Sequence, residues 1–257
     1  MVWGFAAAAV CAHRATTQNI INARSNIKNI LPVAPLPRPK RRAPSPPAVC
    51  LRLGIDMPLQ NRVTPYGEIV ALPGRGLLMG NRGILHDDRR RIVRPSQCRR
   101  WIACVLSYKG IRRTIMRPHS YTELFFLDEA TALSAGHRPC AECRRSNYNR
   151  FKALWQACHG GEVSAEGMDS QLHAERGGGR RKRTYRARVN ELPDGAFILL
   201  DAAPWLVWNG ELHAWSGCGY TKRRPLRGLR DVEVLTPPST VAVVSAGYRP
   251  MVHPTAQ

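Results

Sequence analysis

The chain has 257 residues, of which 39 are lysine or arginine and 18 are aspartate or glutamate, so its formal net charge is +21. Hydrophobic residues make up 44% of it, which is enough for a packed core and excludes a wholly disordered basic protein. The longest apolar run, residues 5–12, falls far short of the ~20 residues that a bilayer-spanning helix needs, so no membrane span is predicted.

Residues 1–56 differ in composition from the rest of the chain. The first 55 residues contain no acidic residue, and seven prolines lie within residues 31–47. We expect a disordered Pro- and Arg-rich leader. Our preferred interpretation is translated sequence upstream of a native start at Met57, and the alternatives are a targeting peptide and a polyproline docking strip at residues 35–40.

The positive charge persists when the leader is set aside. Residues 57–257 carry 31 basic and 17 acidic residues, a net charge of +14. Such an excess predicts a negatively charged partner, and we expect nucleic acid, in the first place DNA. The competing interpretation is that the arginines reflect codon usage and form a solvated face. The residues expected to contact phosphates are Arg138, Arg144, Arg145, Arg150, Arg180, Arg181, Lys182 and Arg183.

The first half of the chain beyond the leader is typical of strands separated by tight turns. Short apolar runs bounded by Gly and Pro predict strands at residues 68–72 and 76–79. A hairpin is predicted over residues 101–116, where two apolar runs meet at Lys109-Gly110. A further short strand is predicted at residues 123–127.

Two helices are predicted around a pair of cysteines. Residues 128–136 form the first, because Asp128 can cap its N-terminus and Gly136 can end it in a left-handed conformation. The second is amphipathic and extends to about residue 160, with apolar residues recurring at helical spacing from Tyr148 to Cys158.

The second half is again typical of strands. A polar, Gly-rich stretch comes first and predicts a basic linker over residues 161–183. Strands are predicted at residues 184–189, 196–200, 232–235 and 240–244, with a hairpin over 205–215 that turns at Asn209-Gly210. The expected fold class is α+β and strand-rich. We expect a β-rich domain at residues 57–160, then the linker, then a hairpin-rich part at residues 184–257.

Cys140 and Cys143 have the spacing of metal ligands, because two thiolates separated by two residues can chelate one tetrahedral ion. Zinc needs four ligands. Cys104, on a predicted strand 36 residues upstream, is the first candidate for a third, and His137 is the next. His119 and Cys98 are weaker choices. The competing interpretations are a buried apolar role for Cys104 and a capping or surface role for His137.

The stretch from Phe126 to Cys143 resembles the second half of the zinc-binding domain of the Ada alkylation-repair proteins. Those domains have an aromatic strand, a short helix, Arg-Pro-Cys-x-x-Cys and a further helix. The resemblance implies a zinc-stabilised knuckle. The family's upstream Cys-x-x-x-Cys pair, one member of which accepts methyl groups, corresponds here to residues 109–113, which contain no cysteine, so methyl transfer is not expected. Residues 60–69, 121–145 and 235–254 resemble a group of bacterial proteins that begin near Met57.

The expected function is a cytoplasmic nucleic-acid-binding module with a zinc-stabilised knuckle. The alternative from another class is a metal-dependent nuclease or DNA-modification hydrolase. Its acid–base groups would come from His86-Asp87-Asp88 or from His173 and Glu175, although neither set has the ordered spacing of such sites. A redox dithiol is less favoured, because the cysteine pair lacks a thioredoxin-like context. The third alternative is a metal-free globular protein with no nucleic-acid role.

Overall fold

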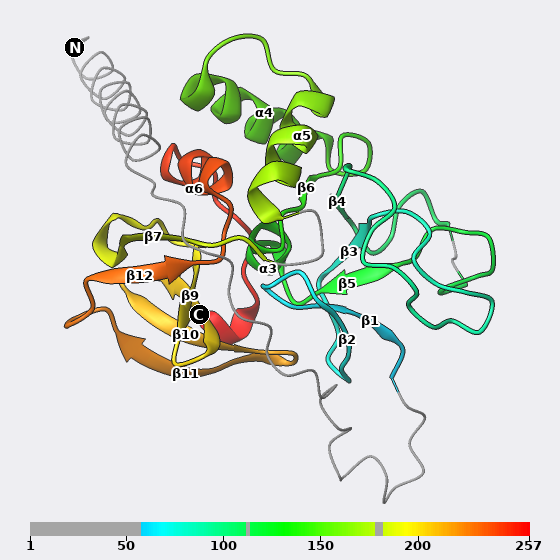
Figure 1. Cartoon of the computed structure of the whole chain (residues 1–257), viewed down its shortest axis with the longest axis horizontal. Coiled ribbons are helices and arrows are strands. Elements are labelled where there is room, and N and C mark those ends of the chain that lie inside the picture. The colour runs from blue at the N-terminus through cyan, green and yellow to red at the C-terminus, as the bar shows by residue number, and fades with distance from the viewer. Residues whose placement is uncertain (1–57, 112–113, 178–181) are drawn as a thin grey trace, which may run out of the picture.

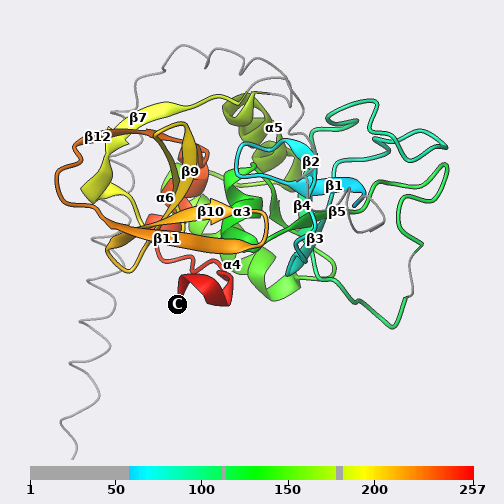
Figure 2. The same cartoon turned by 90° about the horizontal axis from the view of Figure 1, so that it is seen from below.

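The computed structural model describes residues 58–111, 114–177 and 182–257. The leader expected at residues 1–56 lies outside these ranges, as do Arg180 and Arg181. Two six-stranded sheets lie side by side, and helix α3 (Glu129–Ser134) lies between them (Figures 1 and 2). The mainly antiparallel sheets, with four α-helices in the described residues, confirm the expected α+β, strand-rich fold class.

The first sheet is built from short strands of the N-terminal half. In the order β2-β1-β5-β3-β4-β6, they are Ile69–Ala71, Gln60–Val63, Leu124–Phe126, Leu78–Asn81, Ile102–Cys104 and Arg138–Pro139. Two pairs, β1 with β5 and β4 with β6, are parallel, and the others are antiparallel. The strand expected at residues 123–127 is therefore confirmed as β5, and β2 and β3 match the two expected before it.

The second sheet is antiparallel throughout. In the order β11-β10-β9-β8-β12-β7, its strands are Gly219–Pro225, Glu211–Ser216, Ala203–Trp208, Phe197–Leu200, Asp231–Val234 and Tyr185–Arg188. The hairpin predicted around Asn209-Gly210 is confirmed as β9–β10. Both turn residues have positive φ, 50° and 74°, as a two-residue hairpin turn of this kind requires.

The helices flanking the cysteine pair begin and end close to the predicted residues. The Asp128 carboxylate caps α3 by accepting from the backbone N–H of Thr131 at 2.8 Å. Helix α4 (Arg145–His159) follows the pair and buries Phe151, Trp155 and Cys158. The amphipathic helix expected over this stretch is therefore confirmed.

The expected linker over residues 161–183 contains helix α5 (Ala165–Arg176), so that prediction was wrong for this stretch. Ser164 caps the helix by accepting from the N–H of Gly167 at 3.0 Å. Met168 and Leu172, one turn apart, are buried. Two apolar positions are too few to indicate an amphipathic helix in the sequence. A short polar helix of this kind is stabilised mainly by tertiary packing and not by its helix propensity.

Two other local predictions were wrong because tertiary partners outweighed local preference. Residues 240–244 are rich in β-branched side chains but lie in helix α6 (Pro238–Ser245), which packs on α4 and α5. Of the hairpin expected over residues 101–116, only β4 forms a strand. The described residues 105–111 and 114–123 contain none, and β4 pairs with β3 and β6 instead.

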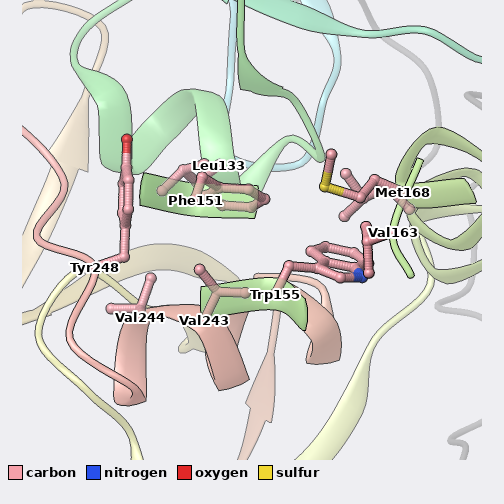
Figure 3. Close-up of a cluster of buried hydrophobic side chains, with 9 residues drawn as sticks. Leu133, Phe151, Trp155, Val163, Met168, Val243, Val244 and Tyr248 are labelled. Atoms are coloured by element: carbon pink, nitrogen blue, oxygen red, sulfur yellow. The ribbon is translucent and has the colours of Figure 1, made fainter. Parts of the chain in front are cut away.

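A helical core joins α3, α4, α5 and α6 beside the two sheets. Phe151 and Tyr248 meet edge-on with ring centroids 5.3 Å apart (Figure 3). The other buried members of this core are Leu133, Trp155, Val163, Met168, Leu172, Val243 and Val244. Within the described residues, no helix has both the length and the apolar character needed to cross a membrane.

Candidate metal centre

Strand pairing brings Cys104 next to Cys140. Cys104 is the last residue of β4, and Cys140 directly follows β6. The parallel register places Ala103 opposite Pro139, and the N–H of Cys140 donates to the carbonyl of Ala103 at 2.9 Å. Two cysteines 36 residues apart in sequence thus become neighbours at one end of a strand pair.

Cys143 completes a group that we call the cysteine cluster: Cys104, Cys140 and Cys143. Their Sγ atoms all lie within 4.8 Å of one another. Cys104 and Cys140 are buried, and Cys143 is partly exposed. All three are free thiols, and apolar side chains surround them, including Met79 and Phe125. The expectation that Cys104 lies next to the Cys140–Cys143 pair is therefore confirmed by the structure.

Hydrogen bonds within the cysteine cluster favour one thiolate. The Cys104 thiol, with the backbone N–H groups of Glu142 and Cys143, lowers the pKa of Cys140 to about 5 against the opposing effect of burial. The hydrogen bond to Cys140 and burial raise the pKa of Cys104, and burial raises that of Cys143. The thiolate form is therefore favoured at Cys140. Because metal ligation needs deprotonated sulfurs, binding of a divalent ion would release protons from the cluster.

The three sulfurs fit a soft, tetrahedral ion. Zinc–sulfur bonds of about 2.3 Å in a tetrahedron place the sulfurs about 3.8 Å apart, which is within the observed 4.8 Å. Three thiolate donors favour zinc over magnesium or calcium, which prefer oxygen ligands. In the described part of the chain, no fourth cysteine, histidine or carboxylate belongs to this group.

His137, the fourth ligand expected from sequence, does not belong to the cysteine cluster. It is fully buried, and its Nε2 accepts from Nε of Arg82 at 3.1 Å. Its ring packs against Trp101 and Phe126. Residues three positions apart in extended chain project to opposite faces, which separates His137 from Cys140.

The two weaker ligand candidates also lie outside the cysteine cluster. The exposed Cys98 thiol donates to the carbonyl oxygens of Arg82 and Arg100 at 3.5 and 3.3 Å. His119 is an exposed loop residue with φ of 60°.

Two arginines expected to contact phosphates are instead buried in ion pairs. Arg138 pairs with Asp169 at 2.8 Å, and Arg144 pairs with Glu129 at 2.8 Å. All four side chains are at most 7% exposed. The prediction that Arg138 and Arg144 contact nucleic acid was therefore wrong, because a buried guanidinium with a carboxylate partner cannot reach a phosphate.

The other expected basic residues differ in exposure. Arg145 and Arg150 are exposed on α4, and Arg150 also donates to the Gly247 carbonyl at 2.8 Å. Arg183 is exposed, whereas the partly buried Lys182 points inward and donates to the Ser134 carbonyl. Lys182 therefore does not lie with the exposed basic residues, whereas Arg145, Arg150 and Arg183 are exposed.

Neither acid–base alternative forms a metal-binding group among the residues that the structure describes. Asp87 accepts from the backbone N–H groups of Arg89 and Arg91 and forms an ion pair with Arg91, as expected of a polar turn. Glu175 accepts from the backbone and hydroxyl of Ser239, which attaches α5 to α6.

Sequence reasoning missed a second group of basic side chains. Arg82 and Arg176 are buried on the ring of Trp101. Neither belongs to a basic run, and the three residues are far apart in sequence, so no local pattern could have identified them.

Comparison of the chain with protein-family models, with curated proteins and with solved structures finds no match.

Proposed function

We propose that this protein binds a zinc ion through Cys104, Cys140 and Cys143 and uses its exposed arginines to bind nucleic acid. The observation that carries the zinc site is the convergence of three sulfurs within 4.8 Å. The resemblance of residues 126–143 to the Ada zinc-binding domain supports the same metal. Zinc would join β4, β6 and the start of α4 at one point and would fix α4 in place.

The nucleic-acid part of the proposal depends on the arginines that remain exposed. Arg145 and Arg150 lie on α4, directly after the cysteine cluster, and Arg183 follows α5. A fixed α4 would hold its arginines in position against the phosphate backbone. Such contacts supply affinity without base readout, so we expect binding that is insensitive to sequence and weakened by salt.

A fourth coordination position that no described residue fills favours one second candidate, a zinc-dependent hydrolase. Structural zinc sites normally have four protein ligands, whereas catalytic sites have three and leave one position for water. The cysteine cluster offers three. A zinc-dependent hydrolase acting on nucleic acid is therefore the second candidate function. A protein that binds neither metal nor nucleic acid would refute both the binding module and the hydrolase.

Metal analysis of the full chain tests the zinc site. We expect about one zinc per chain in the wild type and little or none in Cys104→Ser, Cys140→Ser or Cys143→Ser. The matched control is Cys98→Ser, which removes an exposed thiol outside the cluster and should keep the zinc. A wild type purified without zinc from zinc-supplemented cells, or Cys104→Ser with full zinc content, would contradict the proposal.

Binding and cleavage assays separate the two functions. A binding module should retain duplex or single-stranded DNA with an affinity that falls as salt rises, and it should leave the DNA intact. Zinc-dependent loss of intact plasmid, abolished in Cys104→Ser, would instead establish the hydrolase. Affinity independent of salt would argue against phosphate contacts.

A further inference from the structure

Two buried arginines, Arg82 and Arg176, lie over the ring of Trp101, and the partly buried Lys182 is near enough for their charges to act on it. We call Arg82, Arg176 and Lys182 the cation cluster. The guanidinium carbons of Arg82 and Arg176 lie 3.7 and 3.9 Å from the centroid of the Trp101 ring. Neither arginine is more than 2% exposed. A buried guanidinium group normally has a carboxylate partner that neutralises its charge. The hydrogen-bond and ion-pair partners of these three cations are therefore the next question.

The cation cluster is held only by neutral acceptors. Arg82 donates from Nε to His137 Nε2 at 3.1 Å and from Nη1 to the Gly67 carbonyl at 2.9 Å. The further acceptors are also neutral. They are the Gly136 and Arg99 carbonyls at 3.1 and 2.6 Å and His173 Nδ1 at 3.5 Å for Arg176, and the Ser134 carbonyl for Lys182. These contacts fix the positions of the cations without neutralising their charge.

No carboxylate of the described residues pairs directly with these three cations. Asp169 and Glu175 lie near enough to affect Arg176 and Lys182 electrostatically, but each is bound elsewhere. Asp169 is paired with Arg138 through both oxygens, and Glu175 accepts from Ser239.

Two buried nitrogen atoms of these cations have no hydrogen-bond partner among the described residues: Nη2 of Arg82 and Nε of Arg176. Both atoms are donors, because a guanidinium group offers no acceptor. An acceptor would satisfy them, and the surplus positive charge favours an anionic one.

The electrostatic effects on the titrating groups point in the same direction. Burial and repulsion from Arg176 lower the pKa of Arg82 well below its ordinary value. Burial, then the two arginines, lowers the pKa of Lys182 to about 7. An anion placed among these groups would oppose all of these effects.

The cation cluster lies directly beneath exposed chain. The carbonyls that hold Arg82 and Arg176 include those of Pro95 and Arg99, and both residues are exposed. Gly67, at φ of 86°, has no side chain to cover Nη2 of Arg82, from which a Cβ at that position would be 3.8 Å away.

We propose that the cation cluster is a binding site for a phosphate group, with Arg82, Arg176 and Lys182 as its donors. A phosphate carries up to two negative charges and offers several acceptor oxygens, so it matches two forked guanidinium groups better than a single carboxylate does. The site is separate from the zinc site and does not depend on it.

Calorimetric titration and thermal unfolding of the full chain test the site. At pH 6.5 and constant ionic strength, inorganic phosphate should bind at one equivalent per chain and raise the unfolding temperature until the site is saturated. Lys182→Met and Arg176→Gln should each weaken phosphate binding at least tenfold. The matched control is Lys222→Met, which removes an exposed lysine of β11 and should bind phosphate like the wild type.

Further arms identify the source of the phosphate and separate this site from the zinc site. A 5′-phosphorylated oligonucleotide that binds more tightly than its 5′-hydroxyl form, and only with Lys182 present, would assign the site to nucleic-acid ends. Saturable binding of inorganic phosphate alone would assign it to free phosphate. Cys104→Ser should keep phosphate binding. Absence of saturable binding of either form, or equal binding by wild type, Lys182→Met and Arg176→Gln, would overturn the proposal.

Discussion

Arg138 and Asp169 form a two-point ion pair inside the protein, with Nε donating to Oδ1 at 2.9 Å and Nη2 to Oδ2 at 2.8 Å. Arg138 lies in β6, two residues before Cys140, and Asp169 lies in α5. The pair therefore attaches the strand that positions the metal centre to a helix that sequence reasoning had assigned to a linker.

Asp169→Asn should strongly destabilise the fold. The substitution leaves the buried Arg138 without a negative partner, and the loss of one member of a buried pair costs about 3–5 kcal/mol. Urea unfolding of the full chain measures this cost. The matched control is Asp201→Asn, which breaks the exposed pair with Arg224 and should cost no more than about 0.5 kcal/mol. Equal losses in the two variants would show that the Arg138 pair contributes no more than a surface pair.

Zinc removal should lower the stability of the wild type and leave Cys104→Ser unaffected. A ligand at 100 times its dissociation constant stabilises the folded state by about 2.7 kcal/mol, which corresponds to roughly 5–10 °C in unfolding temperature for a domain of this size. Thermal scans with and without a chelator provide the measurement. If chelation shifts the Cys104→Ser variant as much as the wild type, the stabilising metal is bound elsewhere.

Lys182 should make stability rise with pH. Its pKa is about 7 in the folded protein and 10.5 when unperturbed, with burial, Arg176 and Arg82 lowering it and Glu175 opposing them. Between these values the unfolded chain binds the extra proton, so unfolding becomes less favourable as pH rises. Below pH 7 both states are protonated, and the full cost of burying the charge is present.

Urea unfolding of wild type and Lys182→Met at pH 7, 8.5 and 10, in buffers without phosphate, isolates this contribution. The wild type should gain stability relative to the variant by as much as ~4 kcal/mol across this range. Comparing the two proteins at each pH cancels the titration of the cysteines. Lys222→Met, at an exposed position, should run parallel to the wild type. Parallel curves for Lys182→Met would mean that Lys182 stays charged in the folded protein.

Arg145→Gln should weaken DNA binding equally for all sequences. Removal of one phosphate contact is expected to reduce the slope of log affinity against log salt by about 1. Arg145 is the suitable position because it is exposed at the first residue of α4, directly after the cysteine cluster. Fluorescence anisotropy over a salt series measures the slope. The matched control is Arg224→Gln, which removes the same charge from β11 in the second sheet and should leave the slope unchanged. Equal reductions of the slope by Arg145→Gln and Arg224→Gln would indicate an effect of total charge instead of a local contact.

The elements specified by neighbouring residues could be predicted from sequence. Asp128 caps α3 as expected, and Asn209-Gly210 turns the β9–β10 hairpin as expected. Capping and tight turns depend on contacts within a few residues, so the signal lies in one short stretch. The strand expected at residues 240–244 failed for the converse reason: its β-branched side chains are buried in α6 by distant elements.

For the candidate metal centre, the sequence by itself determined the Cys140–Cys143 pair, since both ligands lie in one turn. Only the tertiary structure decided that Cys104 joins them and His137 does not. The parallel register of β4 and β6 makes that choice, and register is a property of strand pairing.

The charge divides in the same way. The sequence determined a strongly basic protein, with a net charge of +14 beyond residue 56. Only the tertiary structure decided that Arg138 and Arg144 are neutralised by buried carboxylates, while Arg82 and Arg176 are buried with no ion-pair partner in the described part of the chain. A charge count sums the ions but cannot say which of them have partners, because burial and pairing are set by residues far apart in the chain.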